Sequence, residues 1–424
     1  MAQAKTGSRQ RKADRGLEGT EDMVGQFISM VVLEHTRRVD ERGPMGFLSA
    51  GIDCIKSFDP NIPKEEVDRL FRKLKDTRLP KDPIVPDAGD DYGPSLEWIY
   101  KLYSYWCNDY SWLDAQKSIS EWHHYTTEIE SLRVHFIHEK ARVRQKEAIP
   151  LLLVHGWPGT FYEFQNVMKP LLESKSDKDP VFDLVVPSLP GFCWSQGPPR
   201  GWTLQDTARI YDELMKRLGY KEYVAQAGDW GHWVIRELGT GRFSTCKAVH
   251  TNMCPGAPPK GHKMNEREQK AMDRAQWWMG EHLNEGHMVG IMMFIGEKYN
   301  ELADPNLGTA TLDNSHFNND LCTTLSLYFF TPPSIMTSML CYYNNVRHEV
   351  YTEFNAKEEN LIKVPLGVST FPYDAYPVSE AAAKTTGNVV WFKERDHGGH
   401  FACMECPDDM VSDIREFFSK HYKA

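Results

Sequence analysis

The chain has 424 residues, a formal net charge of −10, and 41% hydrophobic and 12% aromatic residues. This composition indicates a globular protein with a large core, and the acidic balance argues against nucleic acid as the main partner. The nine cysteines form no dense framework, which favours reduced thiols and a cytoplasmic protein. No run reaches the ~18–20 apolar residues that a membrane helix requires, so we expect no integral membrane span.

The first third of the chain is predicted to be mainly helical. Residues 1–51 combine a polar, basic tail with one expected helix, Asp22–Arg38. Residues 52–145 carry apolar side chains at helical spacing and end in a strand predicted over Glu130–His138. His135 and His138 in this strand could be metal ligands, but a structural histidine is the better interpretation.

Strand–helix alternation begins at residue 146 and predicts an α/β fold with a doubly wound, mostly parallel sheet. Residues 255–345 interrupt the alternation with helical, aromatic-rich and methionine-rich sequence, which is typical of a lid over a site. The core would therefore comprise residues 146–254 and 346–424. The expected strands are Ile149–Val154, Asp183–Pro187, Lys247–Met253, Leu361–Phe371 and Asn388–Glu394, and the clearest helices are Thr203–Leu218 and Asp408–His421.

The stretch Tyr223–Gly231 has the pattern of a nucleophile elbow, G-x-S-x-G, with aspartate at the nucleophile position. Small residues two positions either side of Asp229 allow the sharp turn that exposes this side chain. An aspartate is ionised at neutral pH and can attack an alkyl carbon without a base. The alternative is an ordinary strand-to-helix turn in which Asp229 caps the helix.

Three further strand ends support the elbow. His155-Gly156-Trp157-Pro158 follows an apolar strand, so the backbone N–H groups of Trp157 and Trp230 could form an oxyanion hole. Asp374 and His400 follow the last two predicted strands. The order nucleophile, acid, histidine is that of α/β-hydrolases.

From about residue 52 onward the chain resembles epoxide hydrolases of the microsomal and fungal type, which have an α/β-hydrolase fold preceded by their own N-terminal region. The motifs that carry this resemblance are Thr77-Arg78-Leu79-Pro80, Asp91-Tyr92-Gly93, Tyr105-Trp106, Tyr110-Ser111-Trp112, Val134-His135-Phe136-Ile137-His138, His155-Gly156-Trp157-Pro158-Gly159, Gly228-Asp229-Trp230-Gly231, Phe371-Pro372-Tyr373-Asp374 and Gly398-Gly399-His400-Phe401-Ala402.

The resemblance implies that Asp229 opens an apolar epoxide and that His400, oriented by Asp374, activates water to hydrolyse the ester. It implies no metal or organic cofactor, and it is consistent with a homodimer. Family members protonate the epoxide oxygen with two lid tyrosines. Tyr343 fits one of them best, with Tyr342 beside it, whereas Trp278 stands where the other is expected. The predicted pocket residues are Trp277, Trp278, Tyr342 and Phe192.

Other interpretations stay open at this point. Haloalkane dehalogenases share the fold and an aspartate nucleophile and hold halide with indole N–H groups, which Trp230 with Trp277 or Trp278 could supply. A hydrolase fold retained only for binding is the non-enzymatic alternative, which the complete set of Asp229, Asp374 and His400 disfavours. The spacing of His397, His400, Cys403 and Cys406 could suggest zinc, but buried thiols at a helix start fit better.

Overall fold

We describe a computed structural model over residues 55–83, 94–143, 147–174, 176, 179–277, 291–331, 333–345 and 351–422. The predicted helix Asp22–Arg38 lies outside these residues. In the part of the chain described, no helix is both long enough and apolar enough to cross a membrane.

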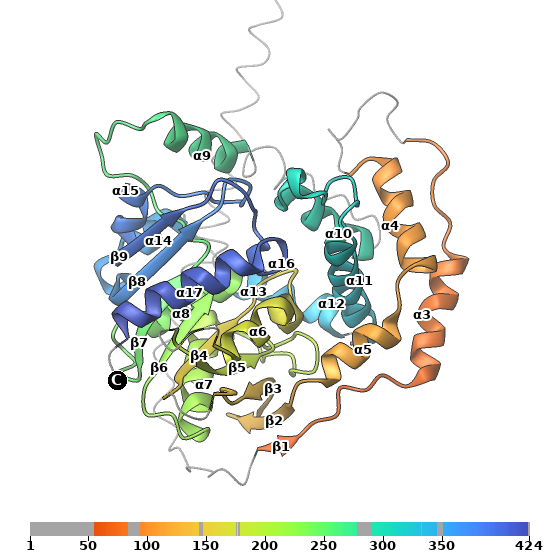
Figure 1. Cartoon of the computed structure of the whole chain (residues 1–424), viewed down its shortest axis with the longest axis horizontal. Coiled ribbons are helices and arrows are strands. Elements are labelled where there is room, and N and C mark those ends of the chain that lie inside the picture. Colours follow the sequence, from red (N-terminus) through yellow and green to blue (C-terminus); the bar gives the residue numbers. More distant parts are fainter. Residues whose placement is uncertain are drawn as a thin grey trace, which may run out of the picture. The chain divides into compact units, whose positions relative to one another are not determined.

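One sheet of nine strands organises the described residues, in the order β1-β2-β3-β5-β4-β6-β7-β8-β9 (Figure 1). The six strands from β5 to β9 in this order run parallel, and β1, β2 and β3 add to the β5 side in antiparallel fashion. The strands are β1 (Lys56–Ser57), β2 (His124–Ile129), β3 (Leu132–Glu139), β4 (Ile149–Val154), β5 (Phe182–Pro187), β6 (Tyr223–Ala227), β7 (Cys246–Thr251), β8 (Ile362–Thr370) and β9 (Gly387–Glu394).

Helices cover both faces of the parallel part of the sheet. Every residue of β5 and β6 is buried, as expected for strands enclosed on both sides. In Figure 1, α6 (Gln165–Leu172) and α17 (Pro407–His421) lie next to each other in front of the strands, and they contact each other. A second contacting pair is α7 (Leu204–Arg217) and α8 (Asp229–Gly239). These positions confirm the predicted α/β-hydrolase architecture.

The predicted capping box of α7 is present. The Thr203 side chain accepts from the backbone N–H of Asp206, and the Asp206 carboxylate accepts from the backbone N–H of Thr203. This reciprocal bonding satisfies two donors that the helix start would otherwise leave unpaired. Local side-chain chemistry therefore sets this helix boundary.

The strand predicted over Glu130–His138 is wrong at its start. Glu130 and Ser131 have φ angles of 52° and 63° and form the tight turn of a hairpin, so β3 begins at Leu132. The preceding strand, β2, is missing from the prediction because its sequence is largely polar. Through β3, this hairpin pairs with β5 and makes the N-terminal region part of the core sheet.

Between β7 and β8 the described chain is helical, which confirms the predicted lid insertion. Its helices are α9 (Glu266–Trp277), α10 (Ile291–Leu302), η4 (Pro305–Leu307), α11 (Ser315–Phe330), α12 (Pro333–Thr337) and α13 (Leu340–Asn344). The remaining short helices are η2 (Phe161–Phe164), α14 (Tyr351–Ala356), η5 (Glu358–Asn360), α15 (Glu380–Ala383), η6 (Lys384–Thr386) and α16 (Ala402–Glu405).

The N-terminal helices α3 (Lys64–Asp76), α4 (Leu96–Asn108) and α5 (Trp112–Ser120) pack against the lid helix α11 (Figure 1). Buried hydrogen bonds join Trp106 Nε1 to Ser326 Oγ at 3.1 Å and Tyr110 to Thr323 at 3.1 Å. The ring of Trp112 lies 4.6 Å from that of Phe330. These aromatic residues, which form part of the sequence resemblance, thus hold the lid in place.

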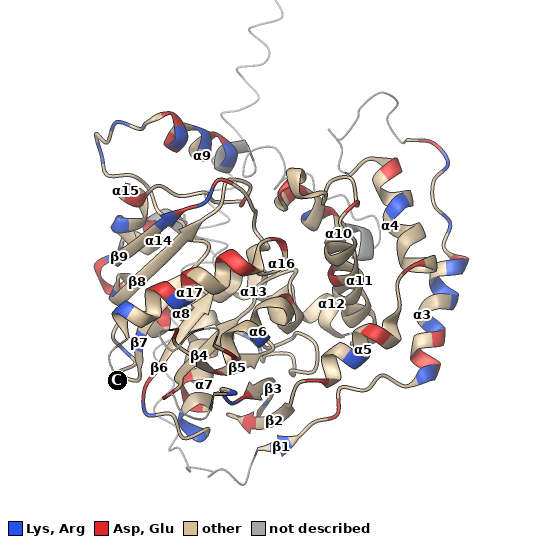
Figure 2. Cartoon of the chain, in the orientation of Figure 1, with Lys and Arg blue, Asp and Glu red and all other residues tan. Residues whose placement is uncertain are grey.

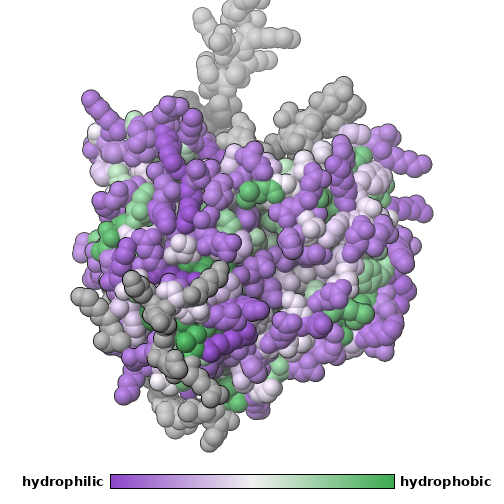
Figure 3. Space-filling view, viewed as in Figure 1, coloured by the Kyte–Doolittle hydropathy of each residue, from purple (hydrophilic) through white to green (hydrophobic). Residues whose placement is uncertain are grey.

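Acidic and basic side chains alternate on the outer helices α3, α9 and α17 (Figure 2). The face shown in Figure 3 is mostly hydrophilic, with small, separate apolar patches. This surface suits a chain whose large aromatic and aliphatic side chains are buried around the sheet.

Candidate active site

Asp229 lies at a sharp turn between β6 and α8. Its φ angle is +44°, in the left-handed region that a residue with a side chain rarely adopts. A side chain on Gly231 would place its Cβ 2.3 Å from the carbonyl oxygen of Val154, so only glycine fits there. The geometry is that of a nucleophile elbow, with a strained, partly buried residue directly after the carboxyl end of β6.

The loop after β4 contributes a hydrogen bond to the Asp229 carboxylate. The backbone N–H of Trp157 donates to Asp229 Oδ1 at 2.6 Å. His155 supports this loop, because its Nε2 accepts from the backbone N–H of Leu189 at 3.0 Å. Trp230 follows Asp229 in the first turn of α8, where N–H groups favour negative charge.

His400 links the nucleophile to Asp374. Its Nδ1 lies 2.6 Å from Asp374 Oδ1, and its Nε2 lies 3.4 Å from Asp229 Oδ2. His400 and Asp374 are buried. Burial disfavours the imidazolium, but the carboxylates of Asp374 and Asp229 outweigh burial and raise the pKa of His400 well above its ordinary value.

The loop that carries His400 is anchored to the lid. The backbone N–H of His400 donates to the carbonyl of Leu302 at the end of α10, at 2.9 Å. The N–H of Gly398 donates to Asp304 Oδ2 at 2.8 Å, and Glu405 accepts from the N–H groups of Asp304 and Phe401. These contacts fix the base relative to the lid helices.

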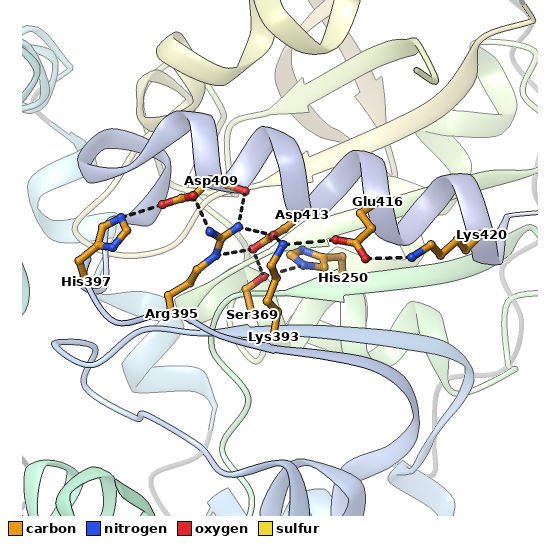
Figure 4. A network of polar contacts seen from close by, with 9 residues as sticks. All are labelled: His250, Ser369, Lys393, Arg395, His397, Asp409, Asp413, Glu416 and Lys420. Carbon is orange, nitrogen blue, oxygen red and sulfur yellow. Dashed lines mark hydrogen bonds and ion pairs between the residues drawn. The ribbon is translucent and has the colours of Figure 1, made fainter. Parts of the chain in front are cut away.

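A network of charged side chains clamps the same loop from its other end (Figure 4). Arg395, just after β9, pairs with Asp409 and Asp413 of α17, and His397 Nε2 lies 2.7 Å from Asp409 Oδ2. Asp413 also accepts from Ser369 of β8 at 2.8 Å. Because β8, β9 and α17 are tied together, the segment from Arg395 to His400 has a defined path.

The lid presents Tyr342, rather than Tyr343, to the nucleophile loops. The Tyr342 ring lies 5.5 Å from that of Trp157 and 4.6 Å from that of Trp230, in edge-to-face arrangements. Tyr343 is 61% exposed. The role of Tyr343 as proton donor stays a prediction, but neighbouring residues of α13 point in different directions, and Tyr342 is the one that lies against the nucleophile loops.

A pocket at Asp229 has about 240 Å³ of empty space, open solvent included. Its lining includes Gly156, Trp157, Glu163, Asp229, Asn252 and His400. The sequence analysis missed Glu163 and Asn252, and the only signal for Glu163 was an acidic residue four positions after Gly159.

Two of the predicted pocket residues, Phe192 and Tyr342, are not in this lining. Phe192 lines a separate pocket with about 290 Å³ of empty space, open solvent included, together with Leu340 and Cys341 of the lid. Trp277 ends α9, but its side chain, like all of Trp278, lies outside the described residues.

The zinc interpretation of the Cys-x-x-Cys segment gains no support. Within the described ranges, no group of three or more His, Cys, Asp or Glu side chains could hold a metal ion. Cys403 and Cys406 are buried free thiols, and burial raises the pKa of both. His400 is instead bonded to Asp374.

The fold and the elbow define a member of the α/β-hydrolase class, and two sequence-family matches agree. Residues 149–303 match the family described as alpha/beta hydrolase fold, and residues 55–164 match the family described as Epoxide hydrolase N terminus. Because the solved structure of an epoxide hydrolase is 30% identical over 89% of this chain, the chain belongs to the epoxide hydrolase family.

Relatives support this assignment over most of the chain. The structure of Aspergillus niger epoxide hydrolase is 30% identical, with a TM-score of 0.76, and the match covers 89% of this chain and 99% of that one. Juvenile hormone epoxide hydrolase from the silkworm Bombyx mori is 25% identical, with a TM-score of 0.77, covering 87% and 94%. Epoxide hydrolase 1 of Sus scrofa is 28% identical over 86% of this chain and 88% of its own length.

Proposed function

We propose that this chain hydrolyses apolar epoxides to vicinal diols through an ester on Asp229. One observation carries the proposal: Asp229 is held by the Trp157 N–H at 2.6 Å and faces a buried His400–Asp374 pair across 3.4 Å. A partly buried carboxylate nucleophile beside a histidine base is the arrangement that a two-step displacement and hydrolysis requires.

In the first step, a carboxylate oxygen of Asp229 attacks a ring carbon of the epoxide. The ring carbon–oxygen bond breaks, and the departing oxygen takes a proton from the Tyr342 phenol. The indole rings around Tyr342 provide an apolar surface, which suits an apolar substrate. A phenol can give up this proton, whereas an indole at position 278 could only donate a hydrogen bond.

In the second step, His400 takes a proton from water, and the resulting hydroxide adds to the ester carbonyl. The N–H groups of Trp157 and Trp230 hold the oxyanion. The ester bond to the diol then breaks, the diol oxygen receives the proton from His400, and the remaining water proton passes from the Asp229 carboxyl group back to the Tyr342 phenolate. Because esterification removes the charge of Asp229, one of the two carboxylates that stabilise the imidazolium is lost when His400 must act as the base.

The two alternatives have less support. Dehalogenation would need indole donors at the halide position, whereas the epoxide hydrolase N-terminal family matches and Tyr342 lies against the nucleophile loops. A binding protein without activity would have no need for the Asp229, His400 and Asp374 geometry.

A single-turnover reaction with a styrene-type epoxide in ¹⁸O-labelled water tests the proposal. The first diol should carry unlabelled oxygen from Asp229, and label should enter the Asp229 peptide only after turnover. Label in the first diol would contradict an ester intermediate. Absence of diol together with halide release from a haloalkane panel would favour dehalogenation.

We also propose a cytoplasmic location and a homodimer. All eight cysteines among the described residues are free, which fits a reducing compartment. The dimer rests on the family resemblance alone. Fractionation of cells that express the tagged chain, and light scattering of the purified protein, test the two points separately.

A further inference from the structure

Glu163 is a third acidic side chain in the cavity that holds Asp229 and His400. We propose that Glu163 is a catalytic residue of the second half-reaction, in which it and His400 hold the water that hydrolyses the Asp229 ester. This inference rests on the proposed ester mechanism and adds a residue to it.

The backbone around Glu163 directs its carboxyl group into the cavity. Glu163 belongs to the short 3-10 helix η2, directly after the loop that binds Asp229. A Cβ on Gly159 would lie 2.0 Å from Glu163 Oε2, so the carboxyl group occupies the space that a side chain at position 159 would fill. The Gly156 backbone also hydrogen-bonds to the carboxyl group. Glycine at position 159 is thus what admits the carboxyl group to the site.

Four ionisable groups from different parts of the chain interact electrostatically with this carboxyl group. They are Asp229 of α8, His400, Tyr299 of α10 and Cys403 of α16. Burial, and then the charge of Asp229, raise the pKa of Glu163 to about 8, while His400 and the Gly156 backbone act in the opposite direction.

The charge relation between the two carboxyl groups suits a two-step reaction. In the free enzyme, burial and the Asp229 carboxylate both favour the protonated form of Glu163. Esterification removes the Asp229 charge, so the repulsion that favours the protonated form of Glu163 disappears. Glu163 therefore becomes a better hydrogen-bond acceptor at the stage where water must be bound.

The water is consumed as follows. Its oxygen bonds to the ester carbonyl carbon, one proton passes to His400 Nε2, and the other stays on the oxygen in a hydrogen bond to Glu163. The ester bond to the diol breaks, and the diol oxygen takes the proton from His400. The second water proton leaves the Asp229 carboxyl group and returns to the Tyr342 phenolate, so that Asp229 regains its charge and the starting state is restored.

The test separates the two half-reactions of Glu163→Gln under single-turnover conditions, with mass analysis of the Asp229 peptide. We expect ester formation within about twofold of the parent and ester hydrolysis slowed about 10- to 100-fold, the size expected for one lost hydrogen bond to the reacting water. The ester should therefore accumulate. An unchanged hydrolysis rate would overturn the role of Glu163.

Gly159→Ala provides a second variant that keeps the carboxyl group but displaces it. It should slow hydrolysis in the same way, and it should add little in the Glu163→Gln background, because both changes remove one interaction. Full additivity would mean that the two residues act separately and would overturn the proposal. This pair also keeps the test valid if Glu163→Gln folds poorly.

Glu237→Gln is the matched control. Glu237 is a buried carboxylate on α8 that pairs with Arg242 at 2.6 Å, and it is absent from the cavity lining. Both half-reactions should keep the parental rates. If the parent chain itself forms no Asp229 ester from an epoxide, the proposed function fails; if it forms and hydrolyses the ester while Glu163→Gln does so equally fast, only the role of Glu163 fails.

Discussion

The core side and the lid side of the site are built differently. On the core side, Asp229, Trp157 and His400 sit on loops at the ends of β6, β4 and β9, and the backbone itself sets their positions. On the lid side, Tyr342 is presented by a five-residue helix, α13. Its position relative to Asp229 depends on how the lid packs.

This difference separates what a motif can specify from what it cannot. A strand end with glycine at fixed offsets has one way to turn, so the residue between the glycines is exposed. Adjacent residues of a helix differ in direction by about 100°, so a pattern with two tyrosines does not say which one faces inward. The comparison predicts large losses of activity for core-side variants. On the lid, it predicts that only one of the two neighbouring tyrosines, Tyr342 and Tyr343, is needed for the reaction.

Asp229→Asn should have the largest effect. An amide is a far weaker nucleophile than a carboxylate, so we expect turnover to fall by at least about 10⁴-fold. Diol formation measured with intact-mass analysis checks this, provided the analysis also shows that the introduced amide has not hydrolysed back to aspartate. Residual activity above about one-hundredth of the parent would contradict the role of Asp229 as the nucleophile.

His400→Gln should allow the first half-reaction and block the second. The ester forms because Asp229 is intact, but its hydrolysis loses the base, which is worth about 10²- to 10⁴-fold. The Asp229 peptide should carry the substrate mass in stoichiometric amount after mixing. Rapid multiple turnover by this variant would show that another group activates the water.

Tyr342→Phe and Tyr343→Phe form a matched pair on the lid side. Loss of the proton donor should lower the rate of ester formation by about 10²-fold for Tyr342→Phe. Tyr343 is 61% exposed, so its variant should remain within about threefold of the parent. The reverse ranking would restore the sequence-based choice of Tyr343 and imply that α13 rotates when substrate binds.

Sequence patterns place Asp229, Asp374 and His400 at strand ends, and the structure brings these three side chains together. The strand over Ile149–Val154 and the order of Asp229, Asp374 and His400 follow from apolar runs and from glycine spacing, which are local properties. Glu163 escaped notice because its entry into the cavity depends on the empty space at Gly159, a relation in three dimensions.

A buried histidine pair in the N-terminal hairpin predicts acid sensitivity. His124 Nδ1 and His135 Nε2 lie 2.9 Å apart, and burial lowers the pKa of His124 to about 4 and that of His135 well below its ordinary value. The unfolded chain therefore binds protons that the folded chain excludes. The stabilisation that the two neutral histidines contribute is fully present above their pKa in the unfolded chain. It is lost as the pH falls from there toward their lower pKa in the folded chain.

From His124 alone, the free energy of unfolding should drop on the order of 2 kcal/mol between about pH 7 and pH 5. Urea unfolding at the two pH values measures this, with the exposed His316→Gln as a control that keeps the full loss. His124→Asn should reduce the pH dependence. An equal loss in the His124→Asn variant would assign the acid sensitivity to other groups.

The smallest expected effect tests whether the N-terminal helices only support the lid or also tune its chemistry. Trp106→Phe removes the 3.1 Å hydrogen bond to Ser326 of α11 and should lower the free energy of unfolding by about 1 kcal/mol. Tyr105→Phe, which loses a more exposed bond to Asn319, should cost less. Because Tyr342 is on a different lid helix, ester formation by folded Trp106→Phe should remain parental. A large loss of ester formation by the fully folded variant would show that the position of Tyr342 depends on the packing of α11. The N-terminal helices would then help to position the proton donor.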